Sequence, residues 1–330
     1  MTSHRPLVLT GIRGPLRSPF RYPGGKSWLA PLLVEWLRQL PRPSVFVEPF
    51  LGGGSVGLAV ADERLAGRVV ATERDPDVAA VWSVVISPSA ERLARHIETF
   101  AFSEDAVRAV LAAAPQDAVA RAFRTIVWNR VSHGGRMTRR AGMLNAGERG
   151  RGISSRWYPA TLAARIRAIA AYAERLDFSC GDGMDLVAAH VGDPSAFVFL
   201  DPPYTAGTKR AGTRLYTFNE LDHEKLFALV TSAAAQVVLT YDDDPTVRAL
   251  AAKAGLEVVE VVMRTTHHER RVELLIGNAL GEVNDARSWD PGCPDHGTAR
   301  AWWNGTEQDE RLRDLQRRAA AARTVPRGFV

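Results

Sequence analysis

The stretch Phe197-Val198-Phe199-Leu200-Asp201-Pro202-Pro203-Tyr204 joins a fully apolar run to an acid, two prolines and a tyrosine. Four apolar residues without alternation are typical of a strand buried on both faces, as in a parallel sheet. Proline lacks an N–H and has a fixed φ, so the strand must end at Asp201. Ligands of open parallel sheets bind at the carboxyl ends of the strands. The stretch therefore predicts a parallel sheet with a functional acid at its edge.

Similar apolar runs recur along the chain and alternate with helical patterns such as 28–40 and 222–235. Alternation of strands and helices predicts an α/β fold with right-handed crossovers. The last two runs are separated by only nine residues, which suits an antiparallel hairpin better than a crossover. The seven predicted strands are 45–47, 68–72, 176–180, 197–200, 236–241, 256–262 and 272–276.

Residues 87–173 interrupt this alternation with helical patterns and a stretch rich in arginine and glycine. Between 118 and 173 there are eleven arginines and one acid, Glu148, so this block carries +10 although the whole chain carries +5. Such a concentration of positive charge predicts a polyanionic partner, with a solvated surface as the alternative. The predicted divisions are a sheet domain at 15–86 and 174–280, an insertion at 87–173 and a polar tail at 281–330.

Composition excludes several classes of protein. The 330 residues are 46% hydrophobic and 24% charged, as in globular proteins and unlike disordered or collagen-like chains. The two cysteines, Cys180 and Cys293, are too few for a disulfide framework or a four-cysteine zinc site. No apolar run approaches the ~20 residues of a transmembrane helix, and the first residues lack a signal-peptide core. We therefore expect a cytoplasmic protein with no membrane partner and no metal.

The four residues Asp201-Pro202-Pro203-Tyr204 carry the groups needed to hold an amine on a flat ring. A carboxylate accepts hydrogen bonds from an amino group. The prolines leave nearby carbonyl oxygens as acceptors without competing N–H donors. The tyrosine ring offers a face for stacking. We interpret these residues as a catalytic site for an exocyclic amine; the alternative is a strand that simply ends in a proline-rich turn.

Two further motifs follow predicted strands. The glycines Gly52-Gly53-Gly54 allow close approach of the backbone to a ligand and precede a helix whose N-terminus favours negative charge. The turn lacks the Gly-Lys-Ser/Thr ending of a phosphate loop, and a purely structural turn is the alternative. Glu73 and Asp75 follow the next strand, where an acid can accept both hydroxyls of a ribose. By spacing alone either acid could do so.

Five motifs in this order resemble one family, the Dam-type (alpha-group) adenine-specific DNA methyltransferases that use S-adenosylmethionine. They are RYPGGK at 21–26, VEPFLGGGS at 47–55, ATERD at 71–75, CGDG at 180–183 and FLDPPY at 199–204. RVELLIGN at 271–278 is similar to the last strand of that family. The resemblance implies a Rossmann-like, seven-stranded methyltransferase sheet, mostly parallel with an antiparallel terminal hairpin. It also implies a mainly helical target-recognition region before the third strand, where the basic block lies.

The resemblance implies roles for individual residues. The implied catalytic residues are Asp201, Pro202, Pro203 and Tyr204, and those that bind the cofactor are Tyr22, Lys26, Phe50, Gly52, Gly54, Glu73, Asp182 and Asp201. The expected DNA contacts are Arg130, Arg136, Arg139 and Arg140 in the basic block. Two features depart from the family. Glu73 stands where Asp is common, and the insertion lacks the Phe-Asn-Val-Pro segment, so a recognition sequence does not follow.

The expected function is that of a site-specific methyltransferase. It would transfer the methyl group of S-adenosylmethionine, without a metal, to the N6 amine of a flipped adenine in double-stranded DNA. The alternatives are a methyltransferase for RNA or a protein amide, where related sites favour Asn at the position of Asp201, and a DNA-binding relative without activity. Double-stranded DNA is the expected partner, which is compatible with a cognate restriction endonuclease and with association with the nucleoid.

Overall fold

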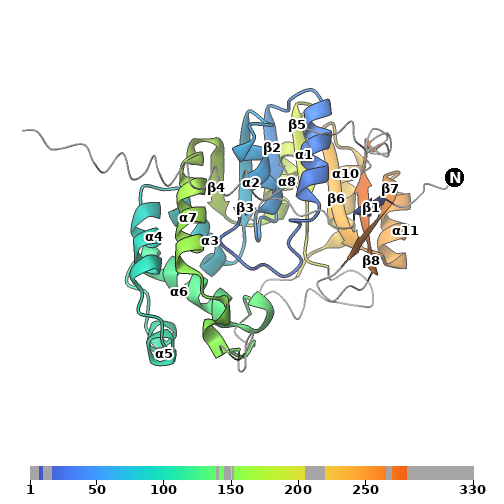
Figure 1. Cartoon of the computed structure of the whole chain (residues 1–330). Helices are drawn as coiled ribbons and strands as arrows, with labels where there is room; N and C mark the ends of the chain where they lie inside the picture. Colours follow the sequence, from blue (N-terminus) through green and yellow to red (C-terminus); the bar gives the residue numbers. More distant parts are fainter. Residues whose placement is uncertain are drawn as a thin grey trace, which may run out of the picture.

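One sheet of eight strands with helices on both faces organises the protein (Figure 1). The computed structural model describes residues 7–9, 17–138, 141–144, 150, 152–204, 220–264 and 270–280. The strands are β1 (Leu7–Leu9), β2 (Val45–Glu48), β3 (Arg68–Glu73), β4 (Leu176–Cys180), β5 (Ala196–Leu200), β6 (Gln236–Asp242), β7 (Glu257–Arg264) and β8 (Arg270–Gly277). Their order across the sheet is β1-β7-β8-β6-β5-β2-β3-β4.

The predicted fold class is confirmed, because strands β2 to β6 are parallel neighbours and β8 is antiparallel to both β6 and β7. β1 is an eighth strand that the sequence analysis does not predict. It pairs with β7 in parallel, with Leu7 opposite Val261. Three apolar residues are too few to show a period, so only the partner strand reveals this element.

The core lies on both faces of the sheet, and successive residues of β2 and β5 alternate between the two. On one face Phe46, Phe197 and Phe199 pack with helices α1 (Ala30–Gln39), α2 (Ser55–Asp62) and α3 (Pro76–Val85). On the other face Val198 and Leu200 pack with helices α8 (Gly183–His190), α10 (His223–Thr231) and α11 (Pro245–Lys253). Central parallel strands are thus covered on both sides, as their unbroken apolar runs predict.

The insertion is mainly helical, as predicted, and shares the core of the first face. Its helices are α4 (Ala90–Thr99), α5 (Glu104–Ala112), α6 (Ala118–Val131), α7 (Pro159–Ala170) and the short 3-10 helices η1 (His133–Gly135), η3 (Gly152–Arg156) and η4 (Ala173–Arg175). α6 packs against α3, and buried side chains of α4, α6 and α7 join one apolar cluster with α1, α2 and α3. The predicted boundary at residue 87 therefore divides the sequence but not the apolar core.

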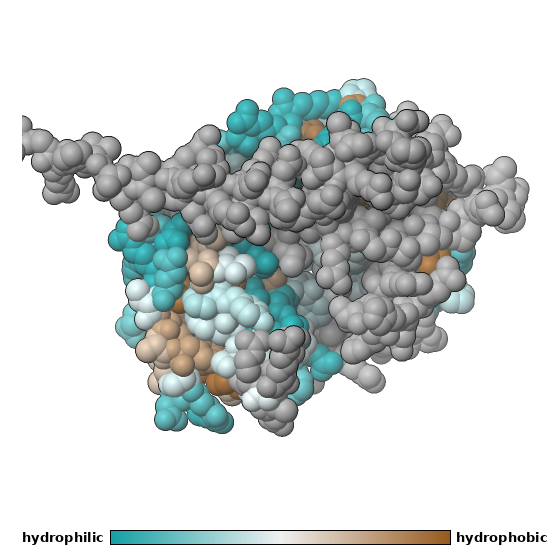
Figure 2. All heavy atoms as spheres, viewed as in Figure 1, coloured by the Kyte–Doolittle hydropathy of each residue, from teal (hydrophilic) through white to brown (hydrophobic). Residues whose placement is uncertain are grey.

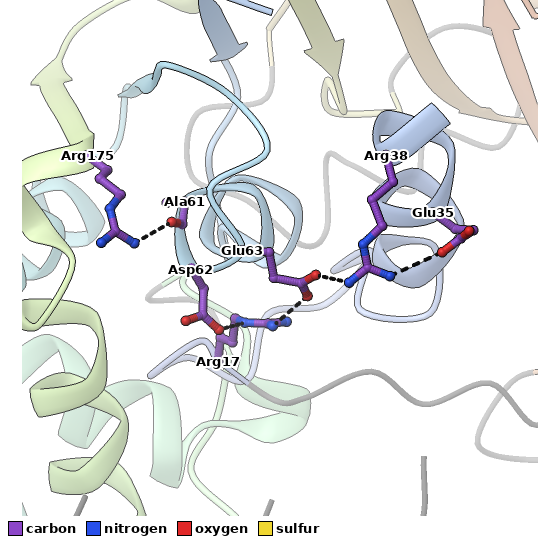
Figure 3. Close-up of polar contacts among 7 residues, drawn as sticks. All are labelled: Arg17, Glu35, Arg38, Ala61, Asp62, Glu63 and Arg175. Atoms are coloured by element: carbon purple, nitrogen blue, oxygen red, sulfur yellow. Dashed lines mark hydrogen bonds and ion pairs between the residues drawn. The ribbon is translucent and has the colours of Figure 1, made fainter. Parts of the chain in front are cut away.

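Polar contacts attach the segment that begins at Arg17 and leads to α1 to the end of α2. Arg17 forms ion pairs with Asp62 at 2.8 Å and with Glu63 at 3.0 Å, and Arg38 reaches the other oxygen of Glu63 at 2.6 Å (Figure 3). Arg175 donates to the carbonyl oxygen of Ala61 in the last turn of α2, where the helix dipole favours a cation. These contacts hold the start of the segment that leads to Tyr22.

The described part of the surface seen in Figure 2 is mostly hydrophilic, with an apolar patch at the lower left, in the region of α5 in Figure 1. Tyr158 is the large hydrophobic side chain that stands out as exposed among the described residues, at 42%. No helix in these described ranges is long and apolar enough to cross a membrane.

Phe197 provides a test of the core. Its ring stacks on Phe46 at a centroid distance of 5.4 Å and meets Trp36 edge-on at 5.5 Å. We expect Phe197→Ala to lower the free energy of unfolding by about 3–5 kcal/mol, because the cavity cannot close around three packed helices. Phe197→Leu should cost less, and Arg108→Ala on the exposed face of α5 should change stability by less than about 0.5 kcal/mol. Urea denaturation measures all three; a small effect of Phe197→Ala would contradict this packing.

Candidate active site

A cavity opens at the carboxyl ends of β2, β3 and β5, where the predicted motifs meet. All eight predicted cofactor residues line it, namely Tyr22, Lys26, Phe50, Gly52, Gly54, Glu73, Asp182 and Asp201. Of the other predicted catalytic residues, Pro203 lines the cavity, whereas Pro202 and Tyr204 are not part of its wall. Parallel strands end at one edge of the sheet, so residues far apart in sequence are brought together there. Their roles in binding and catalysis stay predictions.

The glycine turn is built around the ring of Tyr22. A Cβ on Gly52 would lie 2.8 Å from Cε1 of Tyr22, and a Cβ on Gly53 would lie 2.8 Å from Cβ of Tyr22. Gly52 and Gly54 also have positive φ angles of 47° and 63°. Glycine is therefore required for close packing and for backbone conformation. The turn and the aromatic residue form one wall of the cavity.

Glu73 uses one carboxyl oxygen to hold the glycine turn and the other to hold the start of α3. Oε2 accepts from the Gly52 N–H at 3.0 Å, and Oε1 accepts from the Asp75 N–H at 2.8 Å. Burial raises the pKa of Glu73 to about 7, although these hydrogen bonds oppose the rise. Asp75 instead caps α3, where its side chain accepts from the Asp77 N–H at 2.9 Å. Both acids line the cavity and both already accept backbone N–H groups, so the choice of Glu73 as the acid that faces a ligand stays a prediction.

Asp182 and Gly183 position the aromatic side of the cavity. Asp182 caps α8 by accepting from the Met184 N–H at 2.9 Å. A Cβ on Gly183 would lie only 2.8 Å from Cε1 of Phe50 and 2.5 Å from the carbonyl oxygen of Pro49. The glycine thus lets Phe50 pack directly against the start of α8, beside Asp182.

The ammonium of Lys26 is buried between two acids from distant strands. Its side chain is 3% exposed, and Nζ lies 2.8 Å from Oδ1 of Asp201 and 3.6 Å from Oε2 of Glu273. Nζ also donates to the carbonyl oxygen of Gly24 at 2.8 Å. A buried cation is tolerated only with such partners. Lys26 therefore links the loop before α1 to the end of β5 and to the middle of β8.

Asp201 is held by one of its two oxygens. Oδ1 accepts from Thr240 Oγ1 at 2.8 Å and from the Tyr204 hydroxyl at 3.2 Å, in addition to its ion pair with Lys26. Within the described part of the chain, every hydrogen bond and ion pair of Asp201 involves Oδ1. Oδ2 is therefore the oxygen left to accept a hydrogen bond from a ligand at this half-buried carboxylate.

Tyr204, the predicted stacking platform, packs against other side chains of the protein, and its stacking on a base stays a prediction. Its ring stacks on Tyr241 at 5.6 Å with an interplanar angle of 24°, and Nζ of Lys26 lies 4.9 Å from its centroid. Its hydroxyl donates to Asp201 and to Glu273 at 3.3 Å. Burial and these carboxylates raise the pKa of Tyr204 well above its ordinary value, so the hydroxyl stays a donor. The ring and the hydroxyl are both engaged within the protein.

Two buried acids belong to the site but were not among the predicted residues. Glu273 contacts Lys26 and Tyr204 and is 9% exposed, and Glu48 is 3% exposed and lines the cavity. Glu48 accepts from the Gly57 N–H at 2.7 Å. Each stands inside or at the end of an apolar strand, in VFVE and RRVELLIG. An acid in an otherwise apolar run is the signal that could have identified both.

The predicted DNA contacts divide into three cases. Arg130 is 4% exposed and donates to the carbonyl oxygen of Pro19, so its side chain lies largely inside the protein. A DNA contact by Arg130 stays a prediction. Arg136 follows η1 and is exposed. Arg139 and Arg140 lie outside the described residues.

The pH dependence of stability tests the burial of Glu48. Burial raises the pKa of Glu48 from 4.5 to about 8, and the nearby Asp201 adds to the rise. Between these values the folded state holds a proton that the unfolded state has released, so the free energy of unfolding falls as pH rises.

We expect Glu48→Gln to remove part of this fall, because a neutral amide keeps an acceptor for the Gly57 N–H. Urea denaturation at about pH 5 and about pH 8 measures the effect. Glu35→Gln on the exposed side of α1 is the matched control and should keep the pH dependence of the wild type. Parallel pH profiles for the Glu48 variant and the wild type would show that Glu48 does not titrate as a buried acid.

Comparison with known proteins identifies the family. Residues 22–114 and 138–265, more than half of the chain, match the model of the D12 class N6 adenine-specific DNA methyltransferases. No curated protein is matched. The rRNA methyltransferase aviRa from Streptomyces viridochromogenes is 17% identical, with a TM-score of 0.38 over 82% of this chain and 90% of that one. A precorrin-6y C5,15-methyltransferase from Geobacter metallireducens is 12% identical, with a TM-score of 0.32 over 76% and 87%. The family match shows that this chain is a D12 class N6 adenine-specific DNA methyltransferase.

Proposed function

We propose that this enzyme transfers the methyl group of S-adenosylmethionine to the N6 amine of an adenine that is flipped out of double-stranded DNA. The observation that carries the proposal is the free oxygen of Asp201 at the edge of the cavity that also holds the glycine turn and Glu73. An acceptor for an amine thus lies beside groups suited to a nucleoside.

The residues of the cavity support S-adenosylmethionine as the cofactor. Carboxyl groups outnumber cations in its wall even when Glu48, whose pKa is raised to about 8, is set aside as neutral; they are Glu73, Asp75, Asp182, Asp201 and Glu220, against Lys26 and Arg74. Glu73 would accept from the ribose hydroxyls, Phe50 and Asp182 would flank the adenine ring, and the Gly52–Gly54 turn would approach the ligand closely. When bound, the cofactor supplies an electrophilic methyl group.

The chain's own task is to orient the amine and to stabilise its charge. The lone pair of an exocyclic amine is delocalised into the base, so the nitrogen must become pyramidal before it can attack. Asp201 and the carbonyl oxygen of Pro202 would accept its two N–H groups and stabilise the positive charge that develops. Lys26 and Thr240 fix the other oxygen of Asp201, which directs the remaining acceptor toward the cavity.

The base must leave the duplex to reach this edge of the sheet. A flipped adenine would stack on Tyr204, and that requires its ring to move away from Tyr241. The hydroxyl would then release Glu273 or Asp201, so arrival of the base and rearrangement of the acids would be coupled. Activity in the cytoplasm at the nucleoid, and a cognate restriction endonuclease as a second partner, remain further predictions.

Substitution of Asp201 tests the catalytic step. We expect Asp201→Ala to abolish methyl transfer, since loss of a preorganised acceptor costs about 3–4 kcal/mol in the transition state. Asp201→Asn keeps an acceptor oxygen without the charge and should be less damaging. Transfer of labelled methyl groups to duplex DNA is the measurement, with Asp105→Ala on the exposed face of α5 as the control.

Nucleoside analysis of the product should show N6-methyladenine and no methylcytosine. Parallel reactions with RNA and with protein separate the alternative substrates from DNA. Full activity of Asp201→Ala, or methylation of cytosine, would overturn the proposed mechanism.

Cofactor affinity tests the assignment of Glu73. We expect Glu73→Ala to weaken binding of S-adenosylmethionine by about 1.5–3 kcal/mol, because a charged acceptor for the ribose is lost. Asp75→Ala removes a helix cap and should lower stability by about 1 kcal/mol while leaving the affinity nearly unchanged. Calorimetric titration of both variants measures the affinities; the reverse outcome would assign the ribose to Asp75.

A further inference from the structure

A second cleft, with a volume of about 410 Å³, lies on the other side of Tyr22 from the candidate active site. The two cavities share part of a wall, made of Tyr22, Gly25, Gly53 and Ser55. Segments from four parts of the chain form the cleft, namely residues 17–27, the glycine turn with the start of α2, α6 with η1, and the end of η3 with α7. The cleft therefore lies where the insertion meets the loop that carries Lys26.

The described residues that line this cleft include no aspartate or glutamate. Its charged residues are all arginines, namely Arg17, Arg21, Arg130, Arg156 and Arg165. Hydroxyl groups of Ser18, Ser27, Ser55, Tyr158 and Thr161 complete the polar lining. Five guanidinium groups without a lining carboxylate make a strongly positive concave surface.

The arginines differ in how their charges are balanced. Arg17 is neutralised by Asp62 and Glu63 outside the cleft (Figure 3). Arg130 and Arg165 instead donate to backbone carbonyl oxygens, those of Pro19 and Ser18. Among the described residues no carboxylate forms an ion pair with either of them. Their hydrogen bonds hold the 17–22 segment in place but leave two positive charges uncompensated.

Arg130 shows this most clearly, because it is buried and only partly hydrogen-bonded. It is 4% exposed, and its Nε has no hydrogen-bond partner. Burial and the positive charges of Arg165, Arg21 and Arg156 lower its pKa to about 9. A buried cation next to other cations is costly, and a bound anion would relieve that cost. The unpartnered N–H belongs to a residue that lines the cleft.

We infer that this cleft binds a phosphate group of the DNA backbone next to the nucleotide that enters the active site. Guanidinium groups bind phosphate oxygens in pairs of parallel hydrogen bonds, and hydroxyls add further donors. The inference rests on the proposed function, because DNA is the polyanion that this enzyme acts on. Tyr158, at the rim of the cleft and 42% exposed, offers an aromatic surface to a neighbouring sugar or base.

The shared wall gives this site a mechanistic consequence. Tyr22 separates the phosphate site from the cavity of Lys26 and Asp201, so a strand anchored in the cleft would present its adjacent nucleotide close to those residues. Phosphate contacts fix register without reading sequence. The cleft would thus act in positioning the strand, separately from the residues that choose the site.

The test uses the full chain and three single variants. Arg165→Gln and Arg156→Gln each remove one charge from different sides of the cleft. Arg108→Gln removes one charge from α5, where Arg108 pairs with Glu104 and is 63% exposed, and serves as the matched control. Binding to a linear plasmid duplex is measured by fluorescence anisotropy over a range of salt concentrations, and binding of S-adenosylmethionine is measured by calorimetry.

We expect Arg165→Gln and Arg156→Gln each to weaken DNA binding roughly tenfold. Each should also reduce the slope of log affinity against log salt by ~0.9. Arg108→Gln should change neither quantity, and all three variants should bind the cofactor as the wild type does. Arg165→Lys keeps the charge and should retain most of the salt slope. Because two variants probe the cleft from different helices, misfolding of one does not remove the test.

Two results would overturn the inference. The first is that both cleft variants have the same slope of log affinity against log salt as Arg108→Gln and still methylate DNA. That result would leave the proposed function intact. The second is a loss of cofactor affinity without a change in DNA binding, which would assign the cleft to the carboxylate of the cofactor. Failure of the wild-type protein to bind or methylate DNA would instead reject the proposed function together with the inference.

Discussion

The rest of the site depends on the ion pairs that the buried ammonium of Lys26 forms with two acids. The ammonium contacts Asp201, which follows β5, and Glu273, which lies within β8, and Lys26 belongs to a loop near the start of the chain. Removing one member of a buried ion pair leaves an uncompensated charge and typically costs about 3–5 kcal/mol. The loop, Asp201 and the terminal hairpin are therefore held in one arrangement by a single charge.

The edge of the parallel sheet concentrates acids, and burial controls their charge. Glu48, Glu73 and Asp201 each follow a strand, and all three line the same cavity. Desolvation raises the pKa of Glu48 and Glu73, whereas Asp201 faces a lysine. Burial therefore disfavours the charged form of both glutamates near neutral pH. The carboxyl group of Glu73 also accepts a backbone N–H of the glycine turn, and that of Glu48 accepts a backbone N–H of α2.

The segment from Arg17 to Tyr22 connects the two cavities described above. One of its ends is fixed to α2 by Arg17, and its backbone carbonyls receive the side chains of Arg130 and Arg165. Its last residue, Tyr22, forms the wall between the cofactor cavity and the arginine cleft. Arg130 was expected to contact DNA. Its side chain is buried, and its positive charge lies in the wall of the arginine cleft.

Local sequence determined seven of the eight strands, the parallel sheet and the terminal hairpin, because apolar periodicity is a short-range signal. The eight residues that line the cavity were implied by the resemblance of the ordered motifs to a methyltransferase family. Tertiary structure alone decided the pairing of β1 with β7, the burial of Arg130, the stacking of Tyr204 on Tyr241 and the role of Glu273. Each of these depends on a partner distant in the chain. The orientation of a side chain and the charged groups around it cannot be read from the adjacent residues in the sequence, because both are set by the packing of the whole sheet.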